Sequence, residues 1–130
     1  MSQFDQINLK YKGKLIEVAR AASFRTGQNV VKDTPVDKGM LINNWLTGLG
    51  AIDMNERGAS MAGADSVMAL KFKSDDLVAG QTLYFTNPMP YAPRIEYEGY
   101  SDKAPQGMLV KNTDRWQATV AQVAREIAND

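Results

Sequence analysis

The sequence contains neither histidine nor cysteine. Without these residues the chain cannot form a Ser-His-Asp or Cys-His catalytic group, an imidazole proton shuttle, a thiolate metal site or a disulfide bond. Its 15 Lys and Arg residues equal its 15 Asp and Glu residues in number, so the total charge attracts neither DNA nor an anionic membrane. No apolar run approaches the ~20 residues of a membrane span. These absences argue against an enzyme, a metal site and a membrane protein, and make nucleic acid a poor first expectation.

The remaining composition is that of an ordinary globular domain. Of the 130 residues, 44% are hydrophobic and 23% are charged, which is typical of soluble proteins. Because single domains usually have about 100–150 residues, residues 1–130 are expected to form one domain. The N-terminal residues lack the pattern of a secretory signal, which together with the absence of cysteine predicts synthesis in a reducing cytosol.

A long amphipathic helix is predicted from Phe4 to Val31, because apolar residues recur there three or four positions apart. The stripe comprises Ile7, Tyr11, Leu15, Val18 and Ala22, and is extended by Ala19, Thr26 and Val30. The helix should end before Thr34-Pro35, since proline disfavours the helical conformation of the preceding residue. The segment has an excess of Lys and Arg, which we interpret as a solvated face, with contact to an acidic partner as the alternative.

A second helix is predicted after Gly107 by the clearest periodicity in the chain. Its stripe comprises Leu109, Thr113, Trp116, Val120, Val123 and Ile127. Because Trp116 lies at the centre of this stripe, we expect its side chain in the core. Its replacement by alanine should then cost about 3–5 kcal/mol.

Two strands are predicted between the terminal helices. Residues 40–52 alternate in the manner of a strand, which should direct Trp45 into the core. Residues 81–87 give the stronger pattern, because Leu83 and Phe85 alternate with residues that strands also favour. The expected fold class is α+β, with a small antiparallel sheet packed against the long N-terminal and C-terminal helices.

The segment between the two predicted strands is expected to contain a loop, a short helix and a turn. Residues 53–64 are expected to be a mobile loop. Residues 65–72 are expected to be a short helix, with a strand as the alternative. Ser74-Asp75-Asp76 should form a turn or a cap.

Two prolines restrict the backbone after the second predicted strand. Pro88 and Pro90 each fix a backbone angle and remove a donor, so they should hold an extended corner. At most two helical turns are expected at residues 92–97, followed by a loop at 99–107.

Carboxylate pairs are the remaining candidates for chemistry: Asp75 with Asp76, and Glu96 with Glu98. General acid and base catalysis needs one carboxyl of raised pKa in a concave site, and adjacent residues in a turn point in different directions. We interpret all four as structural or solvated, with a catalytic Glu96 as the alternative. Neither a complete phosphate-binding glycine motif nor a calcium loop occurs.

Three separated motifs follow one another along the chain. The first is Thr34-Pro35-Val36-Asp37-x-Gly39-x-Leu41, followed by Asn44-Trp45. The second is Tyr84-x-Thr86-Asn87-x-x-Pro90-Tyr91-Ala92 with Glu96, and the third is Ser101-x-x-Ala104-Pro105-x-Gly107-Met108. Together they span residues 34–108. Their combination, in this order, resembles the neck family of tail completion, or head-to-tail joining, proteins of tailed bacteriophages.

The resemblance implies a non-enzymatic virion protein, made in the host bacterial cytoplasm, that forms a hexameric ring at the head–tail junction. Such a ring joins a head-side connector or head-closure protein to a tail terminator or tail tube protein. Double-stranded DNA passes through its lumen without sequence-specific binding. No catalytic residue, metal ion or cofactor is implied.

The residues expected to contact a neighbour or to fix a loop lie mostly in the second and third motifs. They are Trp45, Asn87, Pro88, Pro90, Tyr91, Arg94, Glu96, Ser101, Pro105, Gly107 and Met108. Glu96 is expected to accept hydrogen bonds from loop N–H groups or from Ser101, and so to lock residues 99–107.

A ring of identical subunits needs two different contact surfaces on each copy. One is expected from Tyr91 to Met108, and the other from a terminal helix or from residues 53–64. The alternative is that the tyrosines of this region cover the core of their own domain.

Three other functions stay open from the sequence. A tail terminator or another minor tail component would use a ring subunit of the same kind. A small DNA-associated regulator would use the cationic N-terminal helix and bind duplex DNA in a salt-sensitive manner. A hydrolase would lose its activity on the substitution Glu96→Gln.

Overall fold

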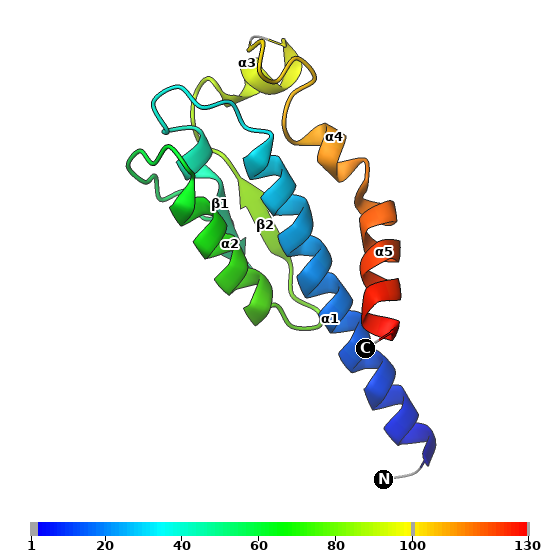
Figure 1. Cartoon of the computed structure of the whole chain (residues 1–130). Helices are drawn as coiled ribbons and strands as arrows, with labels where there is room; N and C mark the ends of the chain where they lie inside the picture. Colours follow the sequence, from blue (N-terminus) through cyan, green and yellow to red (C-terminus); the bar gives the residue numbers. More distant parts are fainter. Residues whose placement is uncertain (1–2, 100, 130) are drawn as a thin grey trace.

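The computed structural model describes residues 3–99 and 101–129, with side chains from residue 14 onward in those ranges. Its elements, in chain order, are α1 (Gln3–Lys32), the 3-10 helix η1 (Ile42–Asn44), β1 (Leu46–Leu49), α2 (Ala64–Asp76), β2 (Leu83–Thr86), α3 (Ala92–Tyr97), α4 (Val110–Thr113) and α5 (Trp116–Ala128). Helix α1 packs between α2 and α5, and the strands lie behind the helices in this view (Figure 1). The predicted α+β class, with a small antiparallel sheet and long terminal helices, is confirmed.

Helix α1 ends before Pro35, as predicted. Thr34 Oγ1 donates a hydrogen bond to the carbonyl oxygen of Val30 (2.7 Å), so the side chain that follows the helix closes its last turn. Ala22 and Val30 are fully buried. This part of the predicted stripe is confirmed.

The predicted burial of Leu15 is wrong, because 67% of this residue is exposed. Further along α1, Arg20 donates to the carbonyl oxygen of Leu77 just after α2, and Arg25 pairs with Glu126 in α5. Both neighbouring helices therefore end before the level of Leu15, and α1 continues past them (Figure 1). The other predicted stripe residues of this part, Ile7 and Tyr11, lie outside the described side chains.

Strands β1 and β2 pair antiparallel, from Leu46 opposite Thr86 to Leu49 opposite Leu83. The strand predicted at 81–87 is confirmed, whereas the one predicted at 40–52 is a strand only at 46–49. The preceding residues form η1, because the side-chain amide of Asn44 donates to the carbonyl oxygen of Met40 (2.7 Å). Asparagine side chains compete in this way with the hydrogen bonds of a sheet.

Helix α2 confirms the helix predicted at 65–72 and is longer than expected. The turn or cap predicted at 74–76 is wrong, because these residues form the last turn of α2 and Ser74 is fully buried. The two helical turns predicted at 92–97 are α3.

The single helix predicted after Gly107 is divided into α4 and α5, with Arg115 outside helical geometry at φ −90° and ψ 6°. The break interrupts the periodicity between Thr113 and Trp116. Val123 is buried, as expected, but Trp116 is 39% exposed, so its predicted central place in the core is wrong. No helix among the described residues has both the length and the hydrophobicity that a membrane crossing requires.

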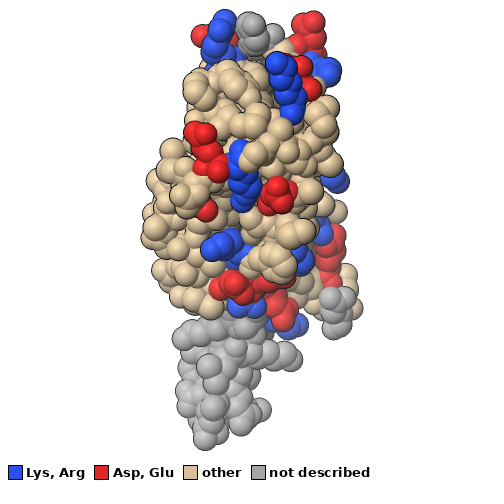
Figure 2. Space-filling model, turned by 90° about the vertical axis from the view of Figure 1, so that its left-hand side faces the viewer, with Lys and Arg blue, Asp and Glu red and all other residues tan. Residues whose placement is uncertain are grey.

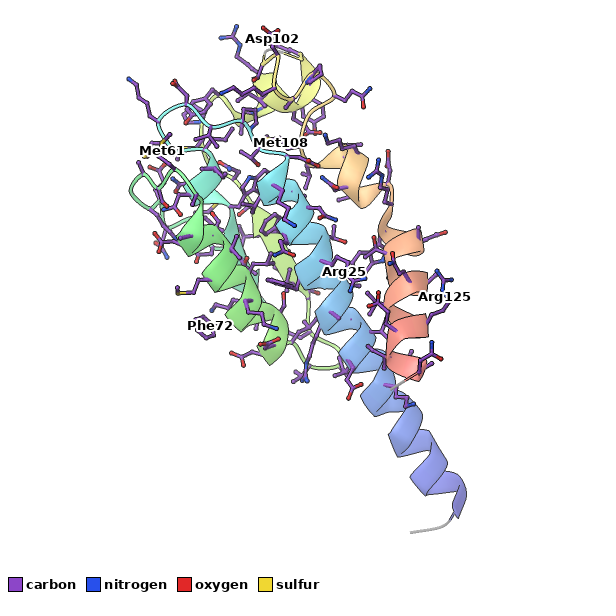
Figure 3. All side chains as sticks on the ribbon, in the orientation of Figure 1. Arg25, Met61, Phe72, Asp102, Met108 and Arg125 are labelled. Carbon is purple, nitrogen blue, oxygen red and sulfur yellow. The ribbon has the colours of Figure 1, made fainter. Side chains whose placement is uncertain are left out.

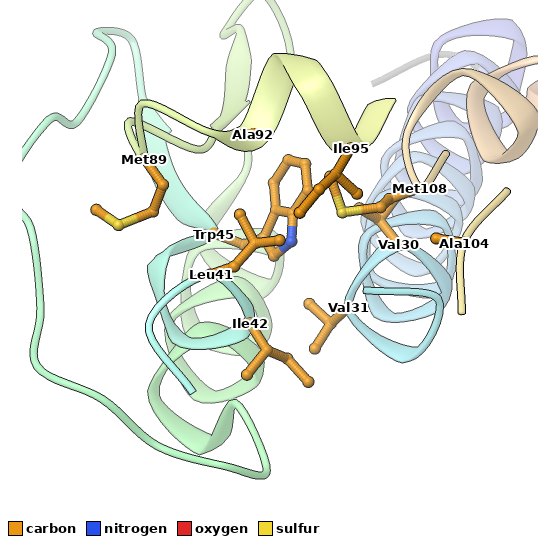
Figure 4. Packing of buried hydrophobic residues seen from close by; sticks show 10 residues of the cluster. All are labelled: Val30, Val31, Leu41, Ile42, Trp45, Met89, Ala92, Ile95, Ala104 and Met108. Carbon is orange, nitrogen blue, oxygen red and sulfur yellow. The ribbon is translucent and has the colours of Figure 1, made fainter. Parts of the chain in front are cut away.

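The main hydrophobic cluster lies where the C-terminal turns of α1 meet η1, α3 and the segment before α4 (Figure 4). It comprises Val30, Val31, Leu41, Ile42, Trp45, Met89, Ala92, Ile95, Ala104 and Met108. Trp45 is 3% exposed, which confirms its predicted burial, and its ring stacks on Phe85 with centroids 4.9 Å apart. The cluster therefore joins all three sequence motifs.

Candidate functional site

The three motifs meet at one end of the molecule, which we call the apical end (residues 33–45, 87–99 and 101–109) and which lies at the top of Figure 1. The first motif is closed by the indole of Trp45, whose Nε1 donates to Thr34 Oγ1 at 2.9 Å. Because the same hydroxyl donates to α1, this pair fixes the loop 35–44 against the end of that helix.

The second motif is tied to the first by Asn87. Its side-chain amide donates to the carbonyl oxygen of Leu41 (2.9 Å), and its Oδ1 accepts the N–H of Met89 (3.1 Å). Pro88 and Pro90 flank Met89, which is buried at 5% exposure in the main cluster. The corner after β2 is therefore held by the buried side chain of Met89 as well as by the two prolines. The sequence analysis assigned no role to Met89.

The third motif is held by Glu96. Its Oε1 accepts the N–H groups of Met108 (2.8 Å) and Leu109 (2.7 Å), and its Oε2 accepts that of Val110 (3.1 Å). Acceptance from backbone N–H groups is thus confirmed, but the donors are residues 108–110, which follow the loop predicted at 99–107. Ser101 Oγ accepts the N–H of Lys103 instead. Because backbone donors occupy both carboxylate oxygens, the geometry favours the loop-fixing interpretation over a catalytic one.

Gly107 makes this arrangement possible. Its φ of +82° is unfavourable for residues with a side chain, and an added Cβ would lie 2.7 Å from Glu96 Oε2. Gly39, with φ +85°, permits an equally close approach of the backbone of Ser60. Both motif glycines therefore adopt a backbone geometry and allow a close approach that a residue with a Cβ would prevent.

A hollow of about 790 Å³ separates the loop 35–41 from α3 and residues 101–103. Three cationic residues and one anionic residue line it: Lys38, Arg94, Lys103 and Asp37. Tyr91 lies at its wall, 42% exposed, and burial, followed by the charge of Asp37, raises the pKa of its hydroxyl. The Lys103 ammonium reaches across to the carbonyl oxygen of Val36 (3.3 Å) and ties the third motif to the first.

A smaller groove of about 300 Å³ lies at the end of β2. Its walls are mainly apolar and include Trp45, Phe85, Tyr97 and Leu109. Tyr97 is 75% exposed. The expectation that the tyrosines cover the core is thus wrong for Tyr91 and Tyr97, while Tyr100 lies outside the described residues.

The structure divides the predicted site residues into three groups. Trp45, Gly107 and Met108 are internal and shape the apical end from within. Pro90, Tyr91, Arg94 and Pro105 are exposed, and Arg94 pairs with Glu98 at 3.3 Å. Asn87, Pro88, Glu96 and Ser101 are half-buried. Only the exposed group is available for contact with another molecule.

Asn43 and Asn44 are structural residues to which the sequence analysis assigned no role. The Asn43 amide donates to Gly58 O and Asp65 Oδ2, and the Asn44 amide donates to Arg57 O. The N–H of Arg57 returns a bond of 2.7 Å to Asn44 Oδ1. The mobile loop was predicted at residues 53–64. These bonds give its residues 53–63 a fixed course, and Ala64 is already the first residue of α2. The sequence signal that could have indicated this role is the pair of consecutive asparagines within the otherwise apolar residues 40–46.

Charges on the face that includes α2 are mixed in sign, with basic and acidic side chains interspersed (Figure 2). Among the described residues, no group of three or more acidic, His or Cys side chains could hold a metal ion. No protein-family model matches this chain, and neither does a curated protein or a solved structure.

Proposed function

We propose that this chain is a structural subunit of the virion of a tailed bacteriophage, which forms a ring at the junction of head and tail. The observation that supports it most is the union of three sequence-distant motifs at the apical end. Three side chains make this union: Asn87, Glu96 and Lys103. The motifs that resemble the neck family thus build one surface rather than three unrelated turns.

The apical end has the properties of a rigid contact surface. Its exposed aromatic and cationic side chains are Arg94 and Tyr97 on α3 and Tyr91 at the N-cap of this helix, which buried residues and prolines hold in place. Tyrosine and arginine are enriched among residues that dominate binding energies. A contact surface that is fixed before binding loses little entropy when a partner docks.

In this proposal six copies form the ring, whose partners are a head-side connector or head-closure protein and a tail terminator or tail tube protein. Double-stranded DNA passes through the lumen without sequence-specific contacts. The balanced charge of the chain is more compatible with DNA passing through the ring than with DNA bound inside it, because a strongly basic lumen would bind the phosphate backbone. A role as tail terminator or other minor tail component is the alternative.

The test is a phage that carries Tyr91→Ala, with Trp116→Ala as the matched control, because the two aromatic residues have similar exposure, 42% and 39%. Both purified variants are first shown to fold by circular dichroism. Lysates are then examined by electron microscopy. We expect filled heads and full-length tails that remain separate for Tyr91→Ala, and joined particles for Trp116→Ala.

Each other outcome has a defined meaning. Joined particles with Tyr91→Ala would exclude the apical end as the joining surface. Missing or overlong tails would favour the tail terminator. Enzymatic activity that disappears with Glu96→Gln in a folded variant would overturn the structural role altogether.

A further inference from the structure

Helix α5 is held to the rest of the fold by few buried residues. Val123 is the one residue of this 13-residue helix that is buried. Among the described residues, the side-chain hydrogen bonds that join α5 to another element run from Arg25 to Glu126, whose side chains are 37% and 50% exposed. Figure 3 shows Arg25 directed from α1 toward α5. Segments with few buried apolar contacts are those that open most easily from a folded protein.

Helix α4, in contrast, is anchored at both its start and its middle. The buried Asn112 amide donates to Asp33 Oδ2 (2.9 Å) and to the carbonyl oxygen of Met108 (2.7 Å). Lys111 adds an ion pair to the same Asp33 oxygen at 3.6 Å, and Glu96 holds the N–H groups at the start of the helix. A movement of α5 would therefore begin at the break that follows α4.

The break itself is confined to the backbone of Arg115. Asp114 is already close to helical geometry at φ −62° and ψ −23°, whereas Arg115 has φ −90° and ψ 6°. Both this conformation and the helical one, near φ −63° and ψ −42°, lie in allowed regions for a residue with a side chain. Arg115 is also exposed. A rotation at this one residue would join α4 and α5 into a single helix over 110–128.

The sequence favours the same continuous helix. Its apolar period passes across the break with spacings of three or four residues: Leu109, Thr113, Trp116, Val120, Val123 and Ile127. Such a stripe is typical of one uninterrupted helix. In the structure α5 lies along α1 at an angle to α4 (Figure 1), so a helix continued straight from α4 would leave α1. The apolar side of α5 would then need a new partner.

We propose that α5 exchanges between copies: the α4–α5 segment straightens at Arg115, and α5 of one copy packs on α1 of another. The occupant is a second copy because its own departing α5 vacates the very surface that α5 contacts in this structure, with Arg25 ready to bind Glu126. Exchange of an identical element is a low-cost route to association. The contact joins two different surfaces, so it can pass from copy to copy around a ring. Ring closure rests on the proposed function, whereas the exchange requires only two copies.

The ion pair between the two helices allows a direct test by charge reversal. Arg25→Glu and Glu126→Arg each place two like charges between α1 and α5 of the same chain. In an exchanged dimer of the two variants, both contacts again pair opposite charges. The purified variants are mixed in equal amounts, incubated until the dimer population is constant, and analysed by native mass spectrometry, which separates them by mass. We expect mixed dimers above the share that random pairing gives, and several-fold more dimers than in either variant alone.

The matched control is the double variant Arg25→Glu with Glu126→Arg, which restores an opposite-charge pair within one chain. It is mixed with parent chain labelled with nitrogen-15, because the two otherwise have the same mass. Like charges then meet only across an exchanged contact, so mixed dimers should fall below the random share. A contact between copies that does not involve exchange would leave this mixture at the random share.

The hinge is tested separately by Arg115→Gly and Arg115→Ala at this exposed position. Glycine disfavours the interior of a helix, whereas alanine favours it. We expect several-fold fewer dimers for Arg115→Gly than for Arg115→Ala at the same concentration.

Mixed dimers at the random share in both mixtures, equal dimer formation by the two hinge variants, or a chain that stays monomeric at every concentration would each overturn the exchange. These measurements use the purified chain alone. A negative result therefore leaves the proposed function intact, and joined particles in the phage that carries Tyr91→Ala would leave the exchange intact.

Discussion

The carboxylate of Glu96 links α3 to the three backbone N–H groups at the start of α4. The substitution Glu96→Gln keeps the size of the side chain but replaces one acceptor oxygen with an NH₂ group that faces a donor. We expect a loss of about 1–3 kcal/mol in the free energy of unfolding. Urea denaturation followed by circular dichroism measures it.

The matched control is Glu98→Gln, two positions along the chain. Glu98 is exposed, and among the residues that the structure describes its ion pair is with Arg94, one helical turn away, so the loss for Glu98→Gln should stay within about 0.5 kcal/mol. Equal losses for the two variants would mean that Glu96 does not anchor the loop.

The two tryptophans should differ strongly in their contribution to stability. Trp45 is 3% exposed and donates a hydrogen bond, so Trp45→Ala should cost about 3–5 kcal/mol. Trp116 is 39% exposed, and its replacement by alanine should cost about 1–2 kcal/mol. The comparison of unfolding free energies tests this order, and a greater cost at Trp116 would contradict it.

Among the helices, α1 and α5 are joined by a two-bond contact between Arg25 and Glu126, with distances of 2.8 and 3.3 Å. The hydrogen bond from Arg25 lowers the pKa of the Glu126 carboxyl and raises the pKa of the guanidinium. The pKa of Glu126 is lower in the folded state than in the unfolded state. The ion pair therefore stabilises the folded chain at pH values above the unfolded-state pKa of about 4.3, and this stabilisation is lost as the pH falls through the folded-state pKa.

Glu126→Gln should therefore lower the urea midpoint at pH 7, and the difference from the parent chain should close in acid below about pH 4. Glu56→Gln, an exposed glutamate of the loop after β1, is the control and should change the midpoint little at either pH. A difference that persists unchanged in acid would show that the ion pair is not its source.

The loop 53–63 should be ordered even in the isolated chain. The N–H of Arg57 is bound to Asn44 Oδ1 at 2.7 Å, so we expect it to be protected from hydrogen exchange. Asn44→Ala should remove this protection, whereas the amides in the centre of α5 should keep theirs. Rapid hydrogen exchange of the Arg57 amide in the parent chain would contradict this expectation and support a mobile loop instead.

Local signals predicted the elements whose causes are local. Pro35 marks the end of α1, and the alternation of Leu83 and Phe85 marks β2. The break at Asp114 and Arg115 has no such marker, because both residues are compatible with a helix. Asn43 and Asn44 act on residues 13 to 22 positions away, which no local pattern shows.

The candidate site was predictable to the extent that the motifs named its residues. The sequence associated Glu96 with loop donors, and its geometry confirms this. It predicted the burial of Trp45, but it did not separate the internal Met108 from the exposed Tyr91 and Arg94. That distinction depends on which side of each segment meets the core, and α3 alone is too short for a periodic pattern to show it.

The whole molecule should be a monomer or a weak oligomer when isolated. Its exposed apolar residues are divided between separate elements, and helix α2 carries Met68 and Phe72 among them. We expect the mass of one chain at low concentration in sedimentation equilibrium, with an increase on concentration. A closed ring that persists on dilution would contradict this prediction.

The pairing of β1 with β2 also has a consequence for synthesis on the ribosome. Leu49 pairs with Leu83, so all of α2 leaves the ribosome before β1 can find its partner. The core around Trp45 needs in addition Ile95 and Met108, which emerge later still. Long-range closure of this kind delays folding until the remote segment is present. A chain truncated before Met108 would lack one residue of this core and the three N–H groups that bind Glu96, so its apical end would be left without this anchor.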